Sequence, residues 1–174
     1  MKTELFALSI IQLVLSIFIV VLVLYFTVTF MRYWFKKRGV ETNNNLAFSI
    51  VGAAVLFSTG YIISGAIQPI INAIRQLSIQ YPETMSQSLQ SVKFVLLFVA
   101  LGFLVSLISN FTGFGLYNIL TKDHHEIQDI KEGKVSTAIL VATVIMVIAL
   151  FVKDSYILML ESLIPYPDMP VRFR

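Results

Sequence analysis

The sequence predicts an all-α membrane protein in which four transmembrane helices form two tandem parallel helix-pair repeats. Of its 174 residues, 57% are hydrophobic and 13% charged, whereas a soluble domain has about half apolar and about a quarter charged residues. The apolar residues form four long runs without charge. Two polar elbows, 32–54 and 121–142, each lead from one run into the next through small residues. We therefore expect one membrane domain, 1–174, with repeat one at about 5–74 and repeat two at about 91–164.

The first transmembrane helix is expected at about 5–31, a stretch of 27 residues without a charged side chain. About 20 apolar residues suffice to cross the hydrocarbon core. A signal peptide would have a shorter apolar region, about 7 to 15 residues, followed by a small-residue cleavage site. A basic cluster follows the helix and marks its end: Arg32, Lys36, Lys37 and Arg38.

The second transmembrane helix is expected at about 46–71. Gly39 closes the preceding segment, and one of Asn43, Asn44 and Asn45 is expected to cap the helix start. Pro69 makes the last turns liable to a kink. Small residues share one face and favour close approach of another helix: Ser49, Ala53, Gly60 and Ser64.

The third transmembrane helix is expected at about 94–118, after a polar connection whose residues 82–87 resemble a capped helix start. It has its own stripe of small or polar residues: Gly102, Ser106, Asn110 and Gly113. Asn110 falls well inside the membrane. An amide there usually bonds to a neighbouring helix, and pore lining is the less favoured alternative.

The second elbow predicts a short amphipathic helix from Asp123 to Gly133 that lies along the membrane face, with Ile127 and Ile130 as its apolar edge. The fourth transmembrane helix is expected at about 135–152, where Lys153 and Asp154 follow. Beyond them, either the helix continues or a separate interfacial helix begins. Prolines at 165, 167 and 170 then favour an extended tail.

Cations in the short connections predict the orientation of the chain, because they are retained on the cytoplasmic side. The first elbow carries the four cations of the basic cluster, and the second carries Lys122, Lys131 and Lys134. Both elbows are therefore expected in the cytoplasm and both termini on the opposite side. Because each repeat holds two spans, the copies share one orientation and predict a pseudo-two-fold axis along the membrane normal.

The sequence offers little reactive chemistry. It has no cysteine, and a net charge of +3 gives no reason to expect nucleic acid as a partner. His124 and His125 are adjacent, so in a helix they cannot both face one metal ion. No catalytic, cofactor or metal site is therefore expected. Polar groups available to a conduction path are Gln12, Asn110, Lys153 and Asp154.

The elbows resemble a known family, the YjfL-like small bacterial inner-membrane proteins that form the domain-of-unknown-function family 350. Leu120–Thr121, Asp123, Glu126–Ile127, Glu132–Gly133 and Val135 match its pattern in the second copy, and Asn45–Leu46–Ala47 and Gly52 match it in the first. Two positions depart from it: Lys134 stands where asparagine is usual, and Ser136 where alanine is usual. The resemblance implies four helices in two copies, an inner-membrane location and a partner-dependent role in the bacterial envelope, with no established activity.

The function expected from these features is that of a non-enzymatic membrane protein that oligomerises, scaffolds envelope partners, or both. The alternative is an oligomeric ion or small-solute channel or transporter, and a membrane-embedded enzyme is less favoured because no paired acid or nucleophile lies in a span. The basic cluster at 32–38 can contact anionic lipid, although stop-transfer charge explains the same residues.

Overall fold

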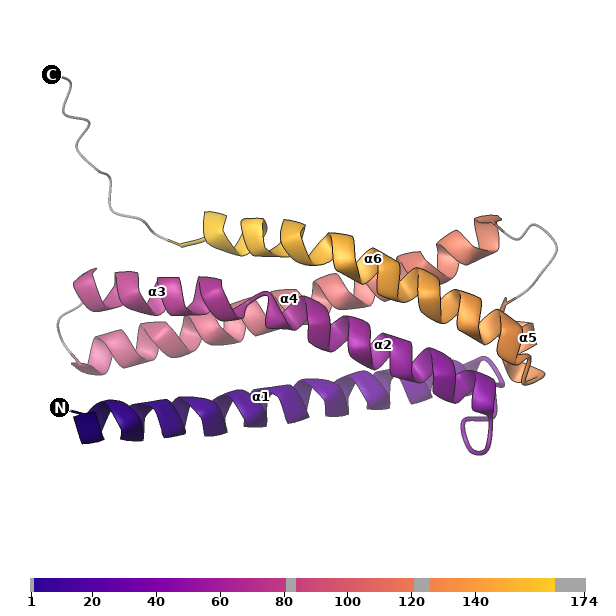
Figure 1. Ribbon diagram of the computed structural model, residues 1–174, viewed down its shortest axis with the longest axis horizontal. Coiled ribbons are helices and arrows are strands. Elements are labelled where there is room, and N and C mark those ends of the chain that lie inside the picture. The colour runs from indigo at the N-terminus through magenta and orange to yellow at the C-terminus, as the bar shows by residue number, and fades with distance from the viewer. Residues whose placement is uncertain (1, 81–83, 121–125, 165–174) are drawn as a thin grey trace, which may run out of the picture.

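A computed structural model of the chain describes residues 2–80, 84–120 and 126–164, and the side chains of 17–77, 90–117, 119 and 127–164. The described residues form an elongated bundle of helices (Figure 1). The helices are α1 (Lys2–Lys37), α2 (Leu46–Ser64), α3 (Ile67–Gln80), α4 (Thr84–Leu120), α5 (Glu126–Lys131) and α6 (Val135–Ser162). Four stretches are long and apolar enough to cross a membrane: Ile17–Lys37, Leu46–Leu77, Gln90–Tyr117 and Val135–Ser162. The chain is thus a multi-pass membrane protein by length and composition.

The two elbows meet at one end of the bundle. α1 ends there, α2 and α6 begin there, and α5 lies across it, at the right of Figure 1. The side-chain amide of Asn45 donates a 2.7 Å hydrogen bond to the carbonyl of Ile130, which ties the first elbow to α5. α2 and α6 run in the same direction and pack along each other more extensively than any other pair of helices in the described chain.

Two apolar clusters hold the helices together. The elbow-end cluster includes Phe35, Phe48, Phe114 and Ile145, with Ile130 of α5 fully buried against it. The far-end cluster gathers Ile62, Phe98, Tyr156 and Leu160 among others. Within it, the Tyr156 hydroxyl donates a 2.6 Å hydrogen bond to the carbonyl of Phe98, so this buried polar atom has a partner.

The second span is interrupted one turn before Pro69. α2 ends at Ser64, and the turn at Gly65 and Ala66 separates it from α3. Pro69 lies in the first turn of α3, where it has no N–H to bond the carbonyl of Gly65. The helical bonds resume from Ile70, whose N–H reaches the carbonyl of Ala66 at 2.9 Å. The interruption therefore precedes the proline.

α6 continues through Lys153 and Asp154 to Ser162 as one helix, which decides between the two alternatives left open for this segment. Lys153 is half-buried, and its ammonium lies 4.1 Å from the centroid of the Tyr61 ring. Asp154 is exposed. A cation over an aromatic face keeps part of its stabilisation without a carboxylate partner, so the helix need not end where the charge occurs.

The small residues of α4 bring it close to α6. A Cβ added at Gly102 would lie 2.6 Å from the Tyr156 hydroxyl oxygen, and one added at Gly113 would lie 2.8 Å from Cγ1 of Ile145. Neither position has room for a side chain without movement of its neighbour. In α2, Gly52 is similarly covered, by Met31 of α1.

Gly102→Ala should destabilise the protein, whereas Gly115→Ala in the same helix should not. Both changes raise helix propensity by about 1 kcal/mol, but only Gly102 meets an atom, at 2.6 Å, while nothing lies within 4 Å of an added Cβ at Gly115. Overpacking costs about 1–3 kcal/mol. Reversible unfolding in mixed micelles measures the difference, and equal stability of the two variants would contradict the close approach of α4 and α6.

Candidate functional site

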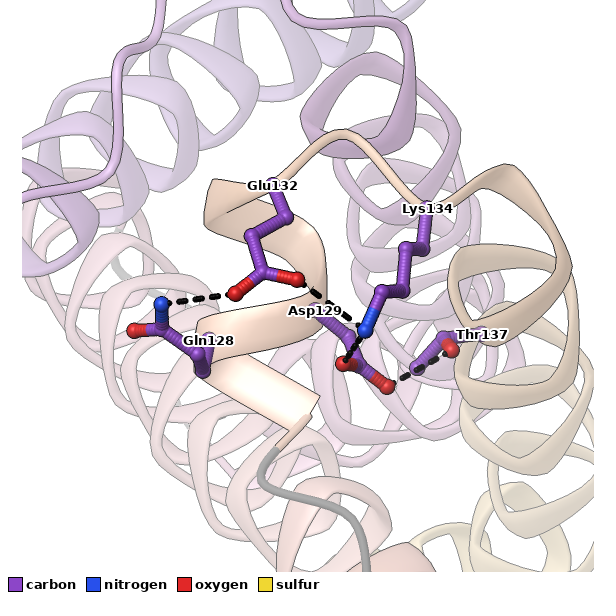
Figure 2. Close-up of polar contacts among 5 residues, drawn as sticks. All are labelled: Gln128, Asp129, Glu132, Lys134 and Thr137. Atoms are coloured by element: carbon purple, nitrogen blue, oxygen red, sulfur yellow. Dashed lines mark hydrogen bonds and ion pairs between the residues drawn. The ribbon is translucent and has the colours of Figure 1, made fainter.

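The second elbow is organised around a buried carboxylate (Figure 2). Asp129 of α5 is 5% exposed and accepts from two side chains on separate oxygens. The ammonium of Lys134 lies 2.7 Å from its Oδ1, and the hydroxyl of Thr137 donates to its Oδ2 at 3.0 Å. The same ammonium lies 3.0 Å from Oε2 of Glu132, whose Oε1 accepts from Gln128 at 2.8 Å. α5 is thereby joined to the first turn of α6.

The backbone explains how these side chains meet. Gly133 adopts φ +77°, a left-handed conformation that ends α5 and reverses the chain. The N–H of Lys134 then donates to the carbonyl of Asp129 at 2.9 Å. This short turn places the lysine side chain over the carboxylate. Thr137 comes one turn later in α6 and completes the contact.

The two elbows start their helices differently. Asn45 caps α2 by accepting the N–H of Phe48 at 3.0 Å. Lys134 has the equivalent position before α6 but makes no capping bond with its side chain. It pairs with Asp129 instead, so the second elbow has an ion pair where the first elbow has a side-chain cap. Of the three asparagines considered from the sequence, Asn45 is the one that caps.

The ion pair shifts two pKa values in opposite directions. Hydrogen bonding from Gln128, and then from Lys134, lowers the pKa of Glu132 below its ordinary 4.5. Hydrogen bonding to Asp129, and then to Glu132, raises the pKa of Lys134 above its ordinary 10.5. Both side chains reach solvent, where water screens the interaction. The contacts therefore order the elbow locally and contribute little to the free energy of unfolding.

Cations from both elbows lie at the same end of the molecule. The predicted lipid-contact residues are exposed: Arg32, Lys36, Lys37 and Arg38. The guanidinium of Arg38 lies 4.0 Å from the Trp34 ring centroid. Lys131 of α5 reaches the first elbow, with its ammonium 3.5 Å from where a Cβ of Gly39 would stand. The elbow end therefore presents a basic surface to which both elbows contribute.

A layer of buried polar residues separates the two apolar clusters. It comes from α1, α2 and α4 and comprises Thr27, Ser58, Thr59, Ser106, Ser109 and Asn110. The amide nitrogen of Asn110 donates to the Thr59 hydroxyl at 3.3 Å, an interhelical bond of the kind its position in the sequence predicts. Three atoms of the layer have no hydrogen-bond partner in the described part of the chain: Ser58 Oγ, Ser109 Oγ and Asn110 Oδ1.

The four polar groups proposed for a conduction path are not gathered into one site. Asn110 belongs to the polar layer, and Lys153 lies over Tyr61 toward the far end. No hydrogen bond or ion pair among the described residues joins Asn110 to Lys153 or Asp154. The side chain of Gln12 lies outside the described residues.

The two predicted packing stripes point in different directions. All four residues of the α4 stripe, Gly102, Ser106, Asn110 and Gly113, are buried within the bundle. In the α2 stripe, Ser49 and Ala53 are exposed, and Gly60 and Ser64 are half-exposed. Nothing lies within 4 Å of a Cβ added at Gly60. The α4 stripe packs inside this chain, and the α2 stripe is left on its outer surface.

The structure holds no group of three histidine, cysteine or acidic side chains suited to a metal ion among the residues it describes. His124 and His125 lie outside those residues. The sequence analysis did not identify Asp129, Thr137 or Thr59 as site residues. The pairing of Asp129 with Lys134 could have been found from an acid that stands five residues before a lysine, with Gly133 between them.

A protein-family model described as Domain of Unknown Function (DUF350) matches residues 3–156. The match covers both elbows and all four candidate spans except the end of α6. No curated protein and no solved structure matches the chain.

Acidification should loosen the second elbow through Glu132. Its folded pKa lies below 4.5, so its contribution is present above that pH and is lost as the pH falls through the folded pKa. Hydrogen-exchange protection of α5 and Lys134, corrected for intrinsic rates, should fall in acid. Glu132→Gln should show a smaller acid-dependent loss than the native chain, and Glu41→Gln, the same charge change in the other elbow, should behave as native. An unaltered profile for Glu132→Gln would refute the assignment.

Proposed function

The chain belongs to the DUF350 family, and we propose that it is a non-enzymatic membrane protein of the bacterial inner membrane that assembles with copies of itself and holds envelope partners. The proposal is supported foremost by the outward α2 stripe. In lipid, helices associate through close packing of small residues and not through a hydrophobic drive. A stripe that is exposed or half-exposed along its length is therefore available to a second copy.

The outer surface of α2 has the shape that such an interface needs. Ala53 is exposed, and Gly60 forms the floor of an open groove of about 100 Å³ between α1 and α2, lined also by Val20, Val23 and Leu24. Phe57, 53% exposed, lies on the same face and stacks on Tyr61 with ring planes 12° apart. The Phe57 ring of one copy can therefore fill the Gly60 groove of a second copy. In a two-fold dimer this contact occurs twice.

We further propose that α1–α2 and α4–α6 are the two repeats, with the basic elbow end in the cytoplasm and both termini outside it. Their parallel courses and the contact between the elbows favour this arrangement, as does the positive-inside rule. In this orientation α5 is the short cytoplasmic helix at the membrane face. The basic surface of both elbows would then meet anionic lipid headgroups, at about 1 kcal/mol for each cation near the surface.

An ion or solute path is the second candidate, and it would lie between copies. Inside one copy the two apolar clusters occupy the helix interfaces on either side of the polar layer. The support for this candidate comes from the oxygens of Ser58, Ser109 and Asn110, which have no hydrogen-bond partner among the described residues. Polar groups inside a membrane commonly mark functional paths. Currents across planar bilayers that change with Asn110→Ala would favour it over a scaffold.

Cysteine cross-linking in native membranes tests the assembly. The chain contains no cysteine, so any cross-link must come from the introduced residue. Ala53→Cys and Phe57→Cys should form disulfide-linked dimers under mild oxidation. Ile139→Cys is the matched control, because Ile139 is 51% exposed on α6, close to the 53% of Phe57. Cross-linking of all three to the same extent would show random collision and would count against the α2 interface.

Gly60→Leu should separate assembly from folding. No atom lies within 4 Å of its added Cβ, so the subunit should unfold at a temperature no lower than that of the native chain, while its association constant for dimer formation falls about tenfold, the effect of about 1.4 kcal/mol lost at the interface. Native mass spectrometry from detergent, over a range of protein concentrations, measures that constant. An association constant equal to that of the native chain would exclude this groove as the contact.

A further inference from the structure

A small pocket lies between α1, α2 and α4 at the edge of the polar layer. Its volume is about 30 Å³, and its walls are almost wholly apolar, with Phe30, Trp34 and Phe111 among them. Two polar side chains also line it: Thr27 of α1 and Asn110 of α4. The pocket therefore joins a set of aromatic rings to one hydroxyl and one amide.

The amide of Asn110 is only half satisfied. The residue is 5% exposed, and its nitrogen donates to the Thr59 hydroxyl at 3.3 Å. Its Oδ1 has no donor within the described residues. A buried polar group without a partner costs about 1–3 kcal/mol, and hydrocarbon around the helices cannot supply the missing bond.

Thr27 provides a second acceptor among the lining residues. Its hydroxyl donates a 2.8 Å hydrogen bond to the carbonyl of Val23, so its oxygen can only accept from an occupant of the pocket. The pocket thus requires an occupant that brings hydrogen-bond donors. A pocket needs about 10–15 Å³ to hold one water molecule, and a volume of about 30 Å³ meets that requirement.

We propose that this pocket, which is partly open at the bundle surface, is a water site, in which one ordered water donates to Asn110 Oδ1 and to Thr27 Oγ1 and so links α1 to α4. The water uses both of its hydrogens, within the usual range of two to four bonds for a buried water. An amide bridged to two helices, by Thr59 directly and by Thr27 through water, then has its nitrogen and its oxygen both satisfied.

A bare cation fits the pocket less well than water. Hard monovalent and divalent cations take about six or more oxygen ligands, whereas the lining offers two side-chain oxygens and no carboxylate. An apolar occupant would leave Asn110 Oδ1 unpartnered. The donor requirement and the volume therefore select water over both.

The pocket lies where α1 changes from buried to mostly exposed. Toward the elbow, Met31 and Phe35 are buried in the bundle. Toward the other end, Ile17–Phe26 is mostly exposed, and an apolar groove of about 350 Å³ opens between α1 and the α3–α4 pair. Thr27 stands at this boundary. The water is the polar link where α1 leaves the bundle.

The test combines direct detection with a double-mutant cycle. In nanodiscs, the labelled Asn110 side-chain amide of the native chain should show magnetisation transfer from a long-lived water, and Thr27→Val should weaken it. Thr27→Val should lower the folding equilibrium constant about threefold, the effect of a typical interhelical hydrogen bond, and Asn110→Leu should lower it further because it also removes the bond to Thr59. The combined loss should be smaller than the product of the two single losses, because both variants remove the same bridge.

Thr112→Val is the matched control. Thr112 is an exposed α4 threonine that also bonds a carbonyl of its own helix, that of Ile108. Combined with Thr27→Val its effect should be additive. Absence of water transfer at Asn110 in the native chain would overturn the proposal even if the variants fail to fold, and so would additive effects of Thr27→Val and Asn110→Leu. Density in the pocket larger than one or two waters would overturn it equally.

Discussion

The hydrocarbon core of a bilayer offers no hydrogen-bond partner, and the arrangement of polar residues in this protein follows from that constraint. Charged side chains lie toward the two ends of the bundle: one group surrounds the elbows, and others, such as Arg75, Lys93 and Glu161, lie toward the far end. The few polar side chains between the apolar clusters are hydroxyls and one amide, which are less costly to bury than charges. Lys153, a half-buried cation of α6, lies against the Tyr61 ring.

The class of the protein and its turning points could be predicted from the sequence, because both depend on local chemistry. Gly39 and Gly133 adopt the positive φ expected at helix ends, and Asn45 caps α2. What periodicity could not predict was which face of each helix is buried. Helices that are apolar all round carry no amphipathic signal, so the stripes of α2 and α4 looked equivalent. The close contacts of Gly102 with Tyr156 and of Gly113 with Ile145 separate the inner stripe from the outer one.

The difference between the elbows could not be read from the sequence for another reason. Asn45 and Lys134 act through partners that lie elsewhere, Ile130 in one elbow and Asp129 in the other. Both partners belong to α5. This short helix therefore organises the beginnings of α2 and α6 together, by a backbone carbonyl and by a carboxylate. The two elbows therefore form one continuous polar surface around α5.

α6 is continuous for 28 residues, which at about 1.5 Å per residue is about 42 Å, longer than the roughly 30 Å thickness of the hydrocarbon core. Its first turn is fixed to α5 through Thr137, and its last turns bury Tyr156 and Leu160 against α4. Such a helix behaves as a stiff rod held at both ends. A rotation imposed on the elbows would be carried, without a hinge to absorb it, to the side chains at the other end of the bundle.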